Sequence, residues 1–177
     1  MKNPPYTKDA LLRNIRKVVP SQVTGSYYRL VSPKRENEIL STQGSFAHGG
    51  RYNPISEFGA LYLGESMEVC KVERDRQTKE FLLVEQVISK IKVSCPKVLD
   101  LTNSGTLKKL GIKKEGILRK EKDGGWDLTW EIARLAYQLG IEGILAPSIT
   151  EAGNNLVIFD KYLESGEIKI VSKQQEV

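Results

Sequence analysis

The chain has 177 residues, of which 40% are hydrophobic, and a formal net charge of +5. This length predicts a single domain with its own hydrophobic core. No apolar run approaches the ~18 residues that a membrane span needs, and residues 1–5 lack the apolar core of a secretion signal. Cys70 and Cys95 are too few for a disulfide framework, so we expect reduced thiols in a cytoplasmic protein.

The first predicted elements are a helix and a strand. Residues 7–18 carry apolar side chains at helical spacing, which predicts an amphipathic helix. These side chains are Leu11, Leu12, Ile15 and Val18. The β-branched and aromatic residues of Ser26–Val31 predict a strand that Pro33 would end. Residues 35–45 are expected to be mostly loop, with at most a short helix.

The middle of the chain predicts further strands and one helix. Ala60–Leu63 has the length and composition of a short buried strand, and Ser66 is suited to cap the helix that follows it. The Val-, Ile- and Leu-rich run Phe81–Val93 predicts one or two strands, and Val98–Leu101 predicts another.

The last third predicts the clearest helix and three more strands. Asp127–Leu139 carries one apolar stripe, and Gly140 is placed to end the helix. The strands are expected at Gly143–Ala146, Asn155–Phe159 and Glu167–Val171. Since only one or two strands stand in β–α–β order, the pattern predicts an α+β fold with a mixed, largely antiparallel sheet. With no repeat or linker, we expect one domain over residues 1–177.

The segment Gly49-Gly50-Arg51-Tyr52-Asn53-Pro54 predicts an anion-binding loop. A glycine pair lets the backbone approach a ligand closely, and proline fixes the exit from the loop. Arg51 offers a planar, permanently charged fork that suits phosphate or carboxylate. These features together are typical of a nucleotide site.

Glu73 is the leading candidate for a functional carboxylate. It follows Val69 by four residues and Cys70 by three, so on a helix it shares their apolar side. A carboxylate at the edge of an apolar stripe is costly unless it has a partner or a function. An ion pair with Arg74 or Arg76 would also explain it. Glu65, just before the helix, is the rival candidate, although stabilisation of the helix N-terminus explains that residue equally well.

Tyr62, Ser148 and His48 each have a structural explanation as well as a functional one. Tyr62 ends a predicted strand, where packing in the core would account for it. Ser148 lies where a buried strand meets a loop, and serines there commonly close turns. His48 is the only histidine, so neither a Ser-His-Asp hydrolase nor a zinc site is expected.

Residues 108–122 form a basic strip. Its seven basic residues stand against two acidic ones, so the strip alone carries a charge equal to the net charge of the chain. It could steer a polyanion or a phosphorylated ligand, or it could simply be the solvated face of short helices. Because it contains no aromatic residue, stacking on single-stranded nucleic acid is not supported.

These motifs resemble those of the RES domain family, which is named for its arginine, glutamate and serine. The resemblance covers roughly 28–159. It rests on Gly-Gly-Arg-Tyr-Asn-Pro, Ala-Leu-Tyr-Leu, Glu73, Gly-Ile-Leu-Ala-Pro-Ser and Asn-Leu-Val-Ile-Phe, in this order. The family usually has Trp after the loop arginine. Here the residue is Tyr52, which keeps an aromatic ring.

The resemblance implies a fold like that of the ADP-ribosyltransferase toxins, with NAD as substrate and neither cofactor nor metal. The active-site positions that it implies are Arg51, Tyr62, Glu73 and Ser148, and the substrate-binding positions are Arg29, Asn53 and Asn155. It also implies a toxin that a helix-turn-helix antitoxin neutralises, so that contact with DNA is made only through the antitoxin. Whether the chain forms a homodimer is left open.

The residue types suit this chemistry. Breaking the bond between nicotinamide and ribose needs no strong base, because nicotinamide leaves as a neutral ring. The barrier lies in the oxocarbenium-like sugar, which Glu73 could stabilise. Arg51 or Arg29 would hold a phosphate group, and Ser148 would position rather than attack. Phosphate or water would be the acceptor; ADP-ribosylation of a protein, and a basic nucleic-acid-binding module, are the alternatives.

Overall fold

The computed structural model describes residues 6–77, 85–119, 125–150, 152–163 and 167–176. Its α-helices are α1 (Lys8–Ile15), α2 (Gln43–His48), α3 (Met67–Gln77), α4 (Ser104–Leu110), α5 (Lys114–Ile117) and α6 (Gly125–Gln138). The 3-10 helices of the described residues are η1 (Pro33–Glu38) and η3 (Asp160–Tyr162). The strands are β1 (Ser21–Val31), β2 (Ala60–Gly64), β3 (Gln86–Asp100), β4 (Gly143–Pro147), β5 (Asn154–Phe159) and β6 (Glu167–Glu176).

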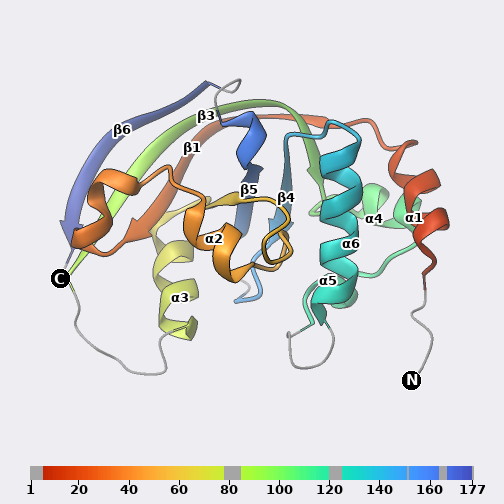
Figure 1. The fold of residues 1–177 in the computed structure, drawn as a ribbon, viewed down its shortest axis with the longest axis horizontal. Coiled ribbons are helices and arrows are strands. Elements are labelled where there is room, and N and C mark those ends of the chain that lie inside the picture. Colours follow the sequence, from red (N-terminus) through yellow and green to blue (C-terminus); the bar gives the residue numbers. More distant parts are fainter. Residues whose placement is uncertain (1–5, 78–84, 120–124, 151, 164–166, 177) are drawn as a thin grey trace.

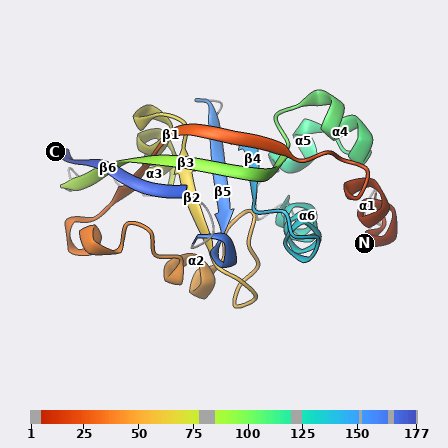
Figure 2. The same ribbon diagram turned by 90° about the horizontal axis from the view of Figure 1, so that it is seen from above.

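The strands form a sheet that closes on itself. Its order is β1-β2-β5-β4-β3-β6, and β1 also pairs with β3. Only the β3–β4 pair is parallel among the described strands. The long strands β1, β3 and β6 arch over the shorter β2, β5 and β4 (Figure 1), and α1, α4, α5 and α6 gather at one end of the arch (Figure 2). The predicted α+β class with a mixed, largely antiparallel sheet is confirmed.

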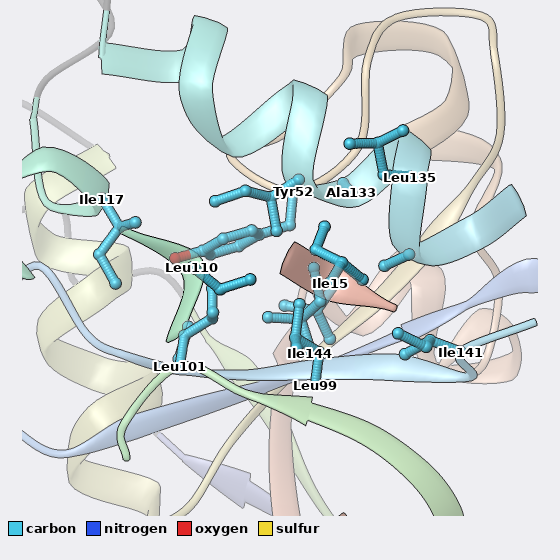
Figure 3. Close-up of a cluster of buried hydrophobic side chains, with 14 of the residues drawn as sticks. Ile15, Tyr52, Leu99, Leu101, Leu110, Ile117, Ala133, Leu135, Ile141 and Ile144 are labelled. Atoms are coloured by element: carbon cyan, nitrogen blue, oxygen red, sulfur yellow. The ribbon is translucent and has the colours of Figure 1, made fainter. Parts of the chain in front are cut away.

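Two hydrophobic clusters hold these layers together. One packs side chains of the long strands against one face of β2 and β5, and it includes Leu61, Leu63, Ile91, Val93, Leu156 and Ile158. The other lies between the opposite face of β2, β5 and β4 and the helices at the end of the arch (Figure 3). Because successive side chains of a strand point to opposite faces, each short strand serves both clusters, and the sheet is buried on both sides.

The prediction of a separate strand at Val98–Leu101 is wrong, because β3 continues through this stretch to Asp100. Val23 on β1 pairs with Cys95 and Ser21 pairs with Val98, so β3 holds one extra residue between these pairs. Such a bulge accommodates the Pro96 position without ending the strand. The predicted strand content of 81–84 lies outside the described residues. Between β1 and β2, η1 and α2 make the chain more helical than expected.

Three of the predicted helix ends follow from local hydrogen bonds and backbone angles, whereas α1 ends at Ile15 rather than at the predicted Val18. Thr7 Oγ1 accepts a hydrogen bond from the Ala10 amide at 3.2 Å, and Ser66 Oγ accepts one from the Val69 amide at 3.2 Å. Gly140 has a φ of 77° beyond the end of α6, where a residue without a side chain is favoured. In the part of the chain that the structure describes, no helix is long and apolar enough to cross a membrane.

Candidate active site

Helix α3 packs closely on the end of β2. Gly64, the last residue of β2, has no side chain; a Cβ there would lie 2.8 Å from Cys70 Sγ and 3.2 Å from Val69 Cβ. Glycine therefore permits the close approach of the helix to the strand. Val69 is fully buried, and Glu73 follows it by about one turn on the same side of α3. This packing directs the Glu73 side chain toward the sheet.

The Glu73 carboxylate lies where β4 ends and β5 begins. Its Oε1 accepts hydrogen bonds from Ser148 Oγ at 2.6 Å and from Asn155 Nδ2 at 3.1 Å. Among the described residues, none donates a hydrogen bond to Oε2. These two hydrogen bonds come from neutral side chains and already account for the position of Glu73, so the alternative of an ion pair with Arg74 is not needed. Arg74 pairs with Asp75 at 2.6 Å. One carboxylate oxygen is thus oriented by two hydrogen bonds, and the other accepts none from the described residues.

Ser148 is arranged to hold the carboxylate. Its side chain is buried, with 1% exposed. A serine hydroxyl donates one hydrogen bond and accepts two. Since the proton is given to Glu73, the oxygen accepts from Thr150 Oγ1 at 2.6 Å and from the Thr150 amide at 3.1 Å. The hydroxyl has no bonding capacity left, which favours positioning over attack.

Tyr62 lies on the same face of the sheet as Asn155. Tyr62 pairs with Val157 and Gly64 pairs with Asn155, so the side chains of residues 62 and 155 point to one side. The Tyr62 hydroxyl donates to Asn53 Oδ1 at 2.8 Å and accepts from the Tyr52 amide at 2.9 Å. Burial raises the pKa of Tyr62, and the nearby charge of the loop arginine opposes this rise only in part. Tyr62 is therefore a neutral phenol at physiological pH.

Arg51 stands in a tight turn. The backbone groups of Gly50 and Asn53 at its two ends are hydrogen-bonded to each other at 2.9 and 3.3 Å. Tyr52 is buried in the core, with 2% exposed. Arg51 Nη1 reaches the end of α5 and donates to the carbonyls of Ile117 at 3.0 Å and Arg119 at 2.7 Å. The guanidinium is held in one place by these contacts, and the Tyr52 amide links the same turn to Tyr62.

Arg29 is a largely buried cation beside the loop that precedes α2. Its Nη1 donates to the carbonyls of Ile39 and, at 3.0 Å, Ser41. Burial lowers the pKa of Arg29 to about 10. Burial raises the pKa of Cys70 to about 11, with Glu73 raising it further and Arg29 lowering it. Cys70 Sγ donates to the carbonyl of Tyr28, the neighbour of Arg29 in β1, at 3.2 Å, and Cys70 precedes Glu73 by three residues on α3. Among the described residues, no hydrogen bond links Arg29 to Glu73.

Asn53 takes part in the site indirectly. Its side chain is 0% exposed, and its Nδ2 donates to the carbonyls of Ser45 at 2.7 Å and Phe58 at 3.2 Å. Both N–H donors of the amide are thus used, and its oxygen accepts the bond from Tyr62. In this arrangement Asn53 orients Tyr62, and substrate binding by Asn53 itself stays a prediction.

The rival residues make no hydrogen bond to Glu73, Ser148 or Asn155 among the described residues. Glu65 is exposed and accepts a hydrogen bond from Asn154 Nδ2 at 2.8 Å. His48 is exposed at the end of α2. Across the described ranges, no group of His, Cys, Asp and Glu is arranged to hold a metal ion. Of these two carboxylates, Glu73 is therefore the one that other predicted site residues hold by hydrogen bonds.

The basic strip lies on α4, α5 and the segment after α5. Its described basic side chains are all exposed: Lys108, Lys109, Lys113, Lys114 and Arg119. Residues 120–122 lie outside the described part of the chain. This exposure agrees with a solvated face of short helices, and a steering role stays a prediction.

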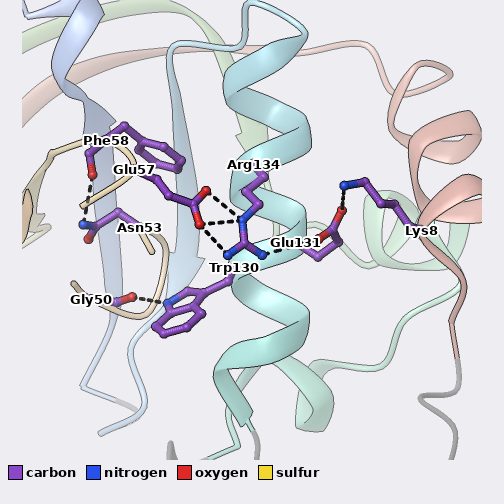
Figure 4. Close-up of polar contacts among 8 residues, drawn as sticks. All are labelled: Lys8, Gly50, Asn53, Glu57, Phe58, Trp130, Glu131 and Arg134. Carbon is purple, nitrogen blue, oxygen red and sulfur yellow. Dashed lines mark hydrogen bonds and ion pairs between the residues drawn. The ribbon is translucent and has the colours of Figure 1, made fainter. Parts of the chain in front are cut away.

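Two residues of the site were missed in the sequence. Thr150 supports Ser148 from two residues away, and a Ser-x-Thr pattern after a strand could have suggested it. Trp130 donates from Nε1 to the Gly50 carbonyl at 2.7 Å (Figure 4). The two residues of this contact are 80 positions apart, so no local pattern indicated it.

The sequence pattern of the RES domain matches residues 26–176. The chain belongs to the RES domain family. This RES domain is 25% identical over 150 residues to the proteins named NAD(+) phosphorylase MbcT of Mycobacterium bovis and Mycobacterium tuberculosis, covering 81% of this chain and 77% of each relative.

The fold of this RES domain is also found in a solved structure. A chain of the Mycobacterium tuberculosis MbcT–MbcA toxin–antitoxin complex matches with a TM-score of 0.82 and 23% identity, over 96% of this chain and 93% of that one. The fold and the family resemblance are thereby confirmed. The roles of the individual site residues stay predictions, and the structure shows how five of them are connected: Glu73 with Ser148 and Asn155, and Tyr62 with Asn53.

Proposed function

We propose that this RES domain cleaves the nicotinamide–ribose bond of NAD with inorganic phosphate as the acceptor. The observation that carries the proposal is the Glu73 carboxylate, which is fixed through Oε1 and has an Oε2 that no described residue bonds. The similarity to proteins named NAD(+) phosphorylase favours phosphate over water. With water as the acceptor, the same arrangement would act as an NAD glycohydrolase.

The reaction makes few demands on acid–base chemistry. The C–N bond between ribose and nicotinamide breaks, and its electron pair leaves with nicotinamide, which becomes a neutral ring. A C–O bond forms between the same ribose carbon and a phosphate oxygen, giving ADP-ribose 1″-phosphate, and the phosphate releases its proton to water. Positive charge grows on the sugar between these events. A preorganised carboxylate near that charge lowers the barrier without reorganising during the reaction.

Each residue of the site has a role in this scheme. Glu73 Oε2 bonds the ribose hydroxyls and stabilises the oxocarbenium-like sugar. Ser148 and Asn155 keep the carboxylate aimed, as their bonds of 2.6 and 3.1 Å to Oε1 allow. Tyr62, which stays a neutral phenol, packs against ribose or nicotinamide. Arg51 supplies positive charge for the diphosphate or the incoming phosphate from its fixed turn.

Arg29 and the partners complete the proposal. Arg29 is a second, largely buried cation, and we assign to it the anion that Arg51 does not hold. Because NAD is a metabolite of the cell interior, the enzyme acts in the cytoplasm and depletes NAD there. A structural relative is part of a toxin–antitoxin complex, so we infer that this chain is a toxin that a helix-turn-helix antitoxin neutralises. DNA is then contacted only through the antitoxin.

The test compares two carboxylates on the same purified protein. Glu73→Gln is expected to remove almost all nicotinamide release, leaving a small measurable rate, while the protein stays folded, and Glu65→Gln is the matched control because Glu65 is exposed and bonds only to Asn154 among the described residues. In cells, the wild-type chain should lower NAD and arrest growth, whereas Glu73→Gln should not. Growth arrest with unchanged NAD would point instead to ADP-ribosylation of a protein.

A further inference from the structure

We propose that Trp130 and Arg134 of α6 are positioning residues that hold the Arg51 turn in its active arrangement. This inference rests on the proposed function, in which Arg51 binds a phosphate group. Both residues are half-buried on α6 and both bond the loop between α2 and β2, at Gly50 and at Glu57 (Figure 4). The loop is thus attached to α6 on each side of the arginine.

The Trp130 contact fixes the carbonyl on which the turn depends. Gly50 O accepts a bond of 3.3 Å from the Asn53 amide across the turn, and it accepts a shorter bond of 2.7 Å from Trp130 Nε1. A carbonyl oxygen has two lone pairs, and both are used. Since Arg51 follows Gly50 directly, rotation of this peptide would move the start of the arginine side chain.

The turn cannot move closer to the sheet at Gly50, because the side chains of Tyr62 and Asn53 fill the space there. A Cβ on Gly50 would lie 2.5 Å from the Tyr62 hydroxyl oxygen and 2.8 Å from Asn53 Oδ1. The backbone at Gly50 is therefore already in contact with the Tyr62 hydroxyl on one side and tied to Trp130 on the other. Loss of the Trp130 bond would free the turn to move away from Tyr62.

The Arg134 contact is a fork of hydrogen bonds to Glu57. Arg134 Nε donates to both Glu57 carboxylate oxygens at 3.0 and 2.8 Å, and Nη2 donates to Oε1 at 2.6 Å. The side chains are 30% and 42% exposed, respectively. Exposed ion pairs contribute little on average, so we rank this contact below that of Trp130. It supports the far end of the loop.

Neither positioning residue belongs to the Glu73 cluster. Trp130 and Arg134 line a groove of about 700 Å³ between α1 and α6, together with Tyr6, Thr7, Lys8, Asp127 and Glu131. None of the predicted site residues lines this groove. Among the described residues, the two residues bond the loop at Gly50 and Glu57 and make no hydrogen bond to a predicted site side chain, so we assign them an effect on the reaction through the loop.

The experiment compares two tryptophans of the same helix. Trp130→Phe keeps an aromatic ring and removes the N–H that bonds Gly50. Trp126→Phe is the matched control: Trp126 lies one turn earlier in α6, and its Nε1 is buried with no partner among the described residues. The two rings lie 5.9 Å apart, so both variants disturb the same region.

The expected result is a selective loss of substrate binding. Trp130→Phe should raise the KM for NAD about three- to tenfold with kcat within about twofold, which matches the loss of one neutral hydrogen bond acting on binding. Trp126→Phe should leave both constants within about twofold. Equal behaviour of the two variants would overturn the assignment, and so would a fall in kcat alone after Trp130→Phe.

A second measurement separates this inference from the proposed function. Hydrogen exchange of the Gly50, Tyr52 and Asn53 amides should be faster in Trp130→Phe than in wild type, and unchanged in Trp126→Phe. If the wild-type chain leaves NAD intact, the proposed function fails, but the exchange rates still test whether Trp130 holds the turn. Unchanged exchange in both variants, with both folded by their melting temperatures, would overturn it.

Discussion

Replacing Ser148 with Ala tests whether this serine acts through Glu73. The Ser148 hydroxyl gives Glu73 Oε1 its shorter hydrogen bond, at 2.6 Å, and the other comes from Asn155 at 3.1 Å. A hydrogen bond to a charged group contributes about 1.5–3 kcal/mol, and each ~1.4 kcal/mol of barrier is a factor of ten in rate. If the bond is needed only to aim the carboxylate, Ser148→Ala should lower kcat about 10- to 100-fold. Glu73→Gln should cost more, because it removes the charge itself.

The assay is nicotinamide release at saturating NAD by wild type, the two single variants and the double variant. A residue that acts through another should lose most of its effect when the other is changed. Ser148→Ala should therefore cost less than about tenfold in the Glu73→Gln background, where a neutral amide accepts the bond. A full, additive loss in the double variant would refute the positioning role. A loss in Ser148→Ala larger than in Glu73→Gln would refute it as well.

Three further predictions concern the rest of the chain. Arg51→Lys keeps the charge but loses the planar guanidinium fork that suits phosphate, so NAD turnover should be badly impaired, and near-normal turnover would shift the phosphate contact to Arg29. Burial raises the pKa of Cys70 to about 11 and that of Cys95 to about 12, from 9.0, so the unfolded chain loses thiol protons first. The stabilisation that comes from the neutral thiols should accordingly be fully present below pH 9.0, and the melting temperature should fall above that pH. The fall should be less steep in Cys95→Ala, and an equal slope would contradict the assignment. Changing Lys108, Lys109, Lys113 and Lys114 to Gln should leave NAD cleavage within a small factor of normal, whereas a large defect that salt removes would show that the strip steers the substrate.

The sequence was most informative where the relevant contacts are local. Helical phase placed Glu73 on the side of α3 that also carries the buried Val69, and the structure confirms that its carboxylate faces the sheet. Ser66 and Gly140 marked helix ends through backbone chemistry within one turn. The order of short strands was sufficient to predict the α+β class, because alternation and turn residues are local properties.

The sequence was least informative about contacts between distant segments. The tether of Gly50 to Trp130 spans 80 positions, and the bonds from Arg51 to the carbonyls after α5 span 66 and 68. Neither depends on a periodic pattern, since a backbone carbonyl can accept from any donor that the fold brings near. The sequence also predicted separate strands where the structure has the single strand β3, because the course of a strand past a proline depends on distant pairing. Whether proline ends a strand or is accommodated in a bulge depends on its pairing partner, here β1.

The most direct test of the proposed activity is incubation of the purified chain with NAD, with and without inorganic phosphate, followed by identification of the products. We predict that NAD is lost, that one nicotinamide is released for each NAD, and that ADP-ribose 1″-phosphate forms only when phosphate is present. Free ADP-ribose in equal amount under both conditions would make water the acceptor and contradict the phosphorylase assignment. Intact NAD with folded wild-type protein would contradict the proposed cleavage of NAD itself.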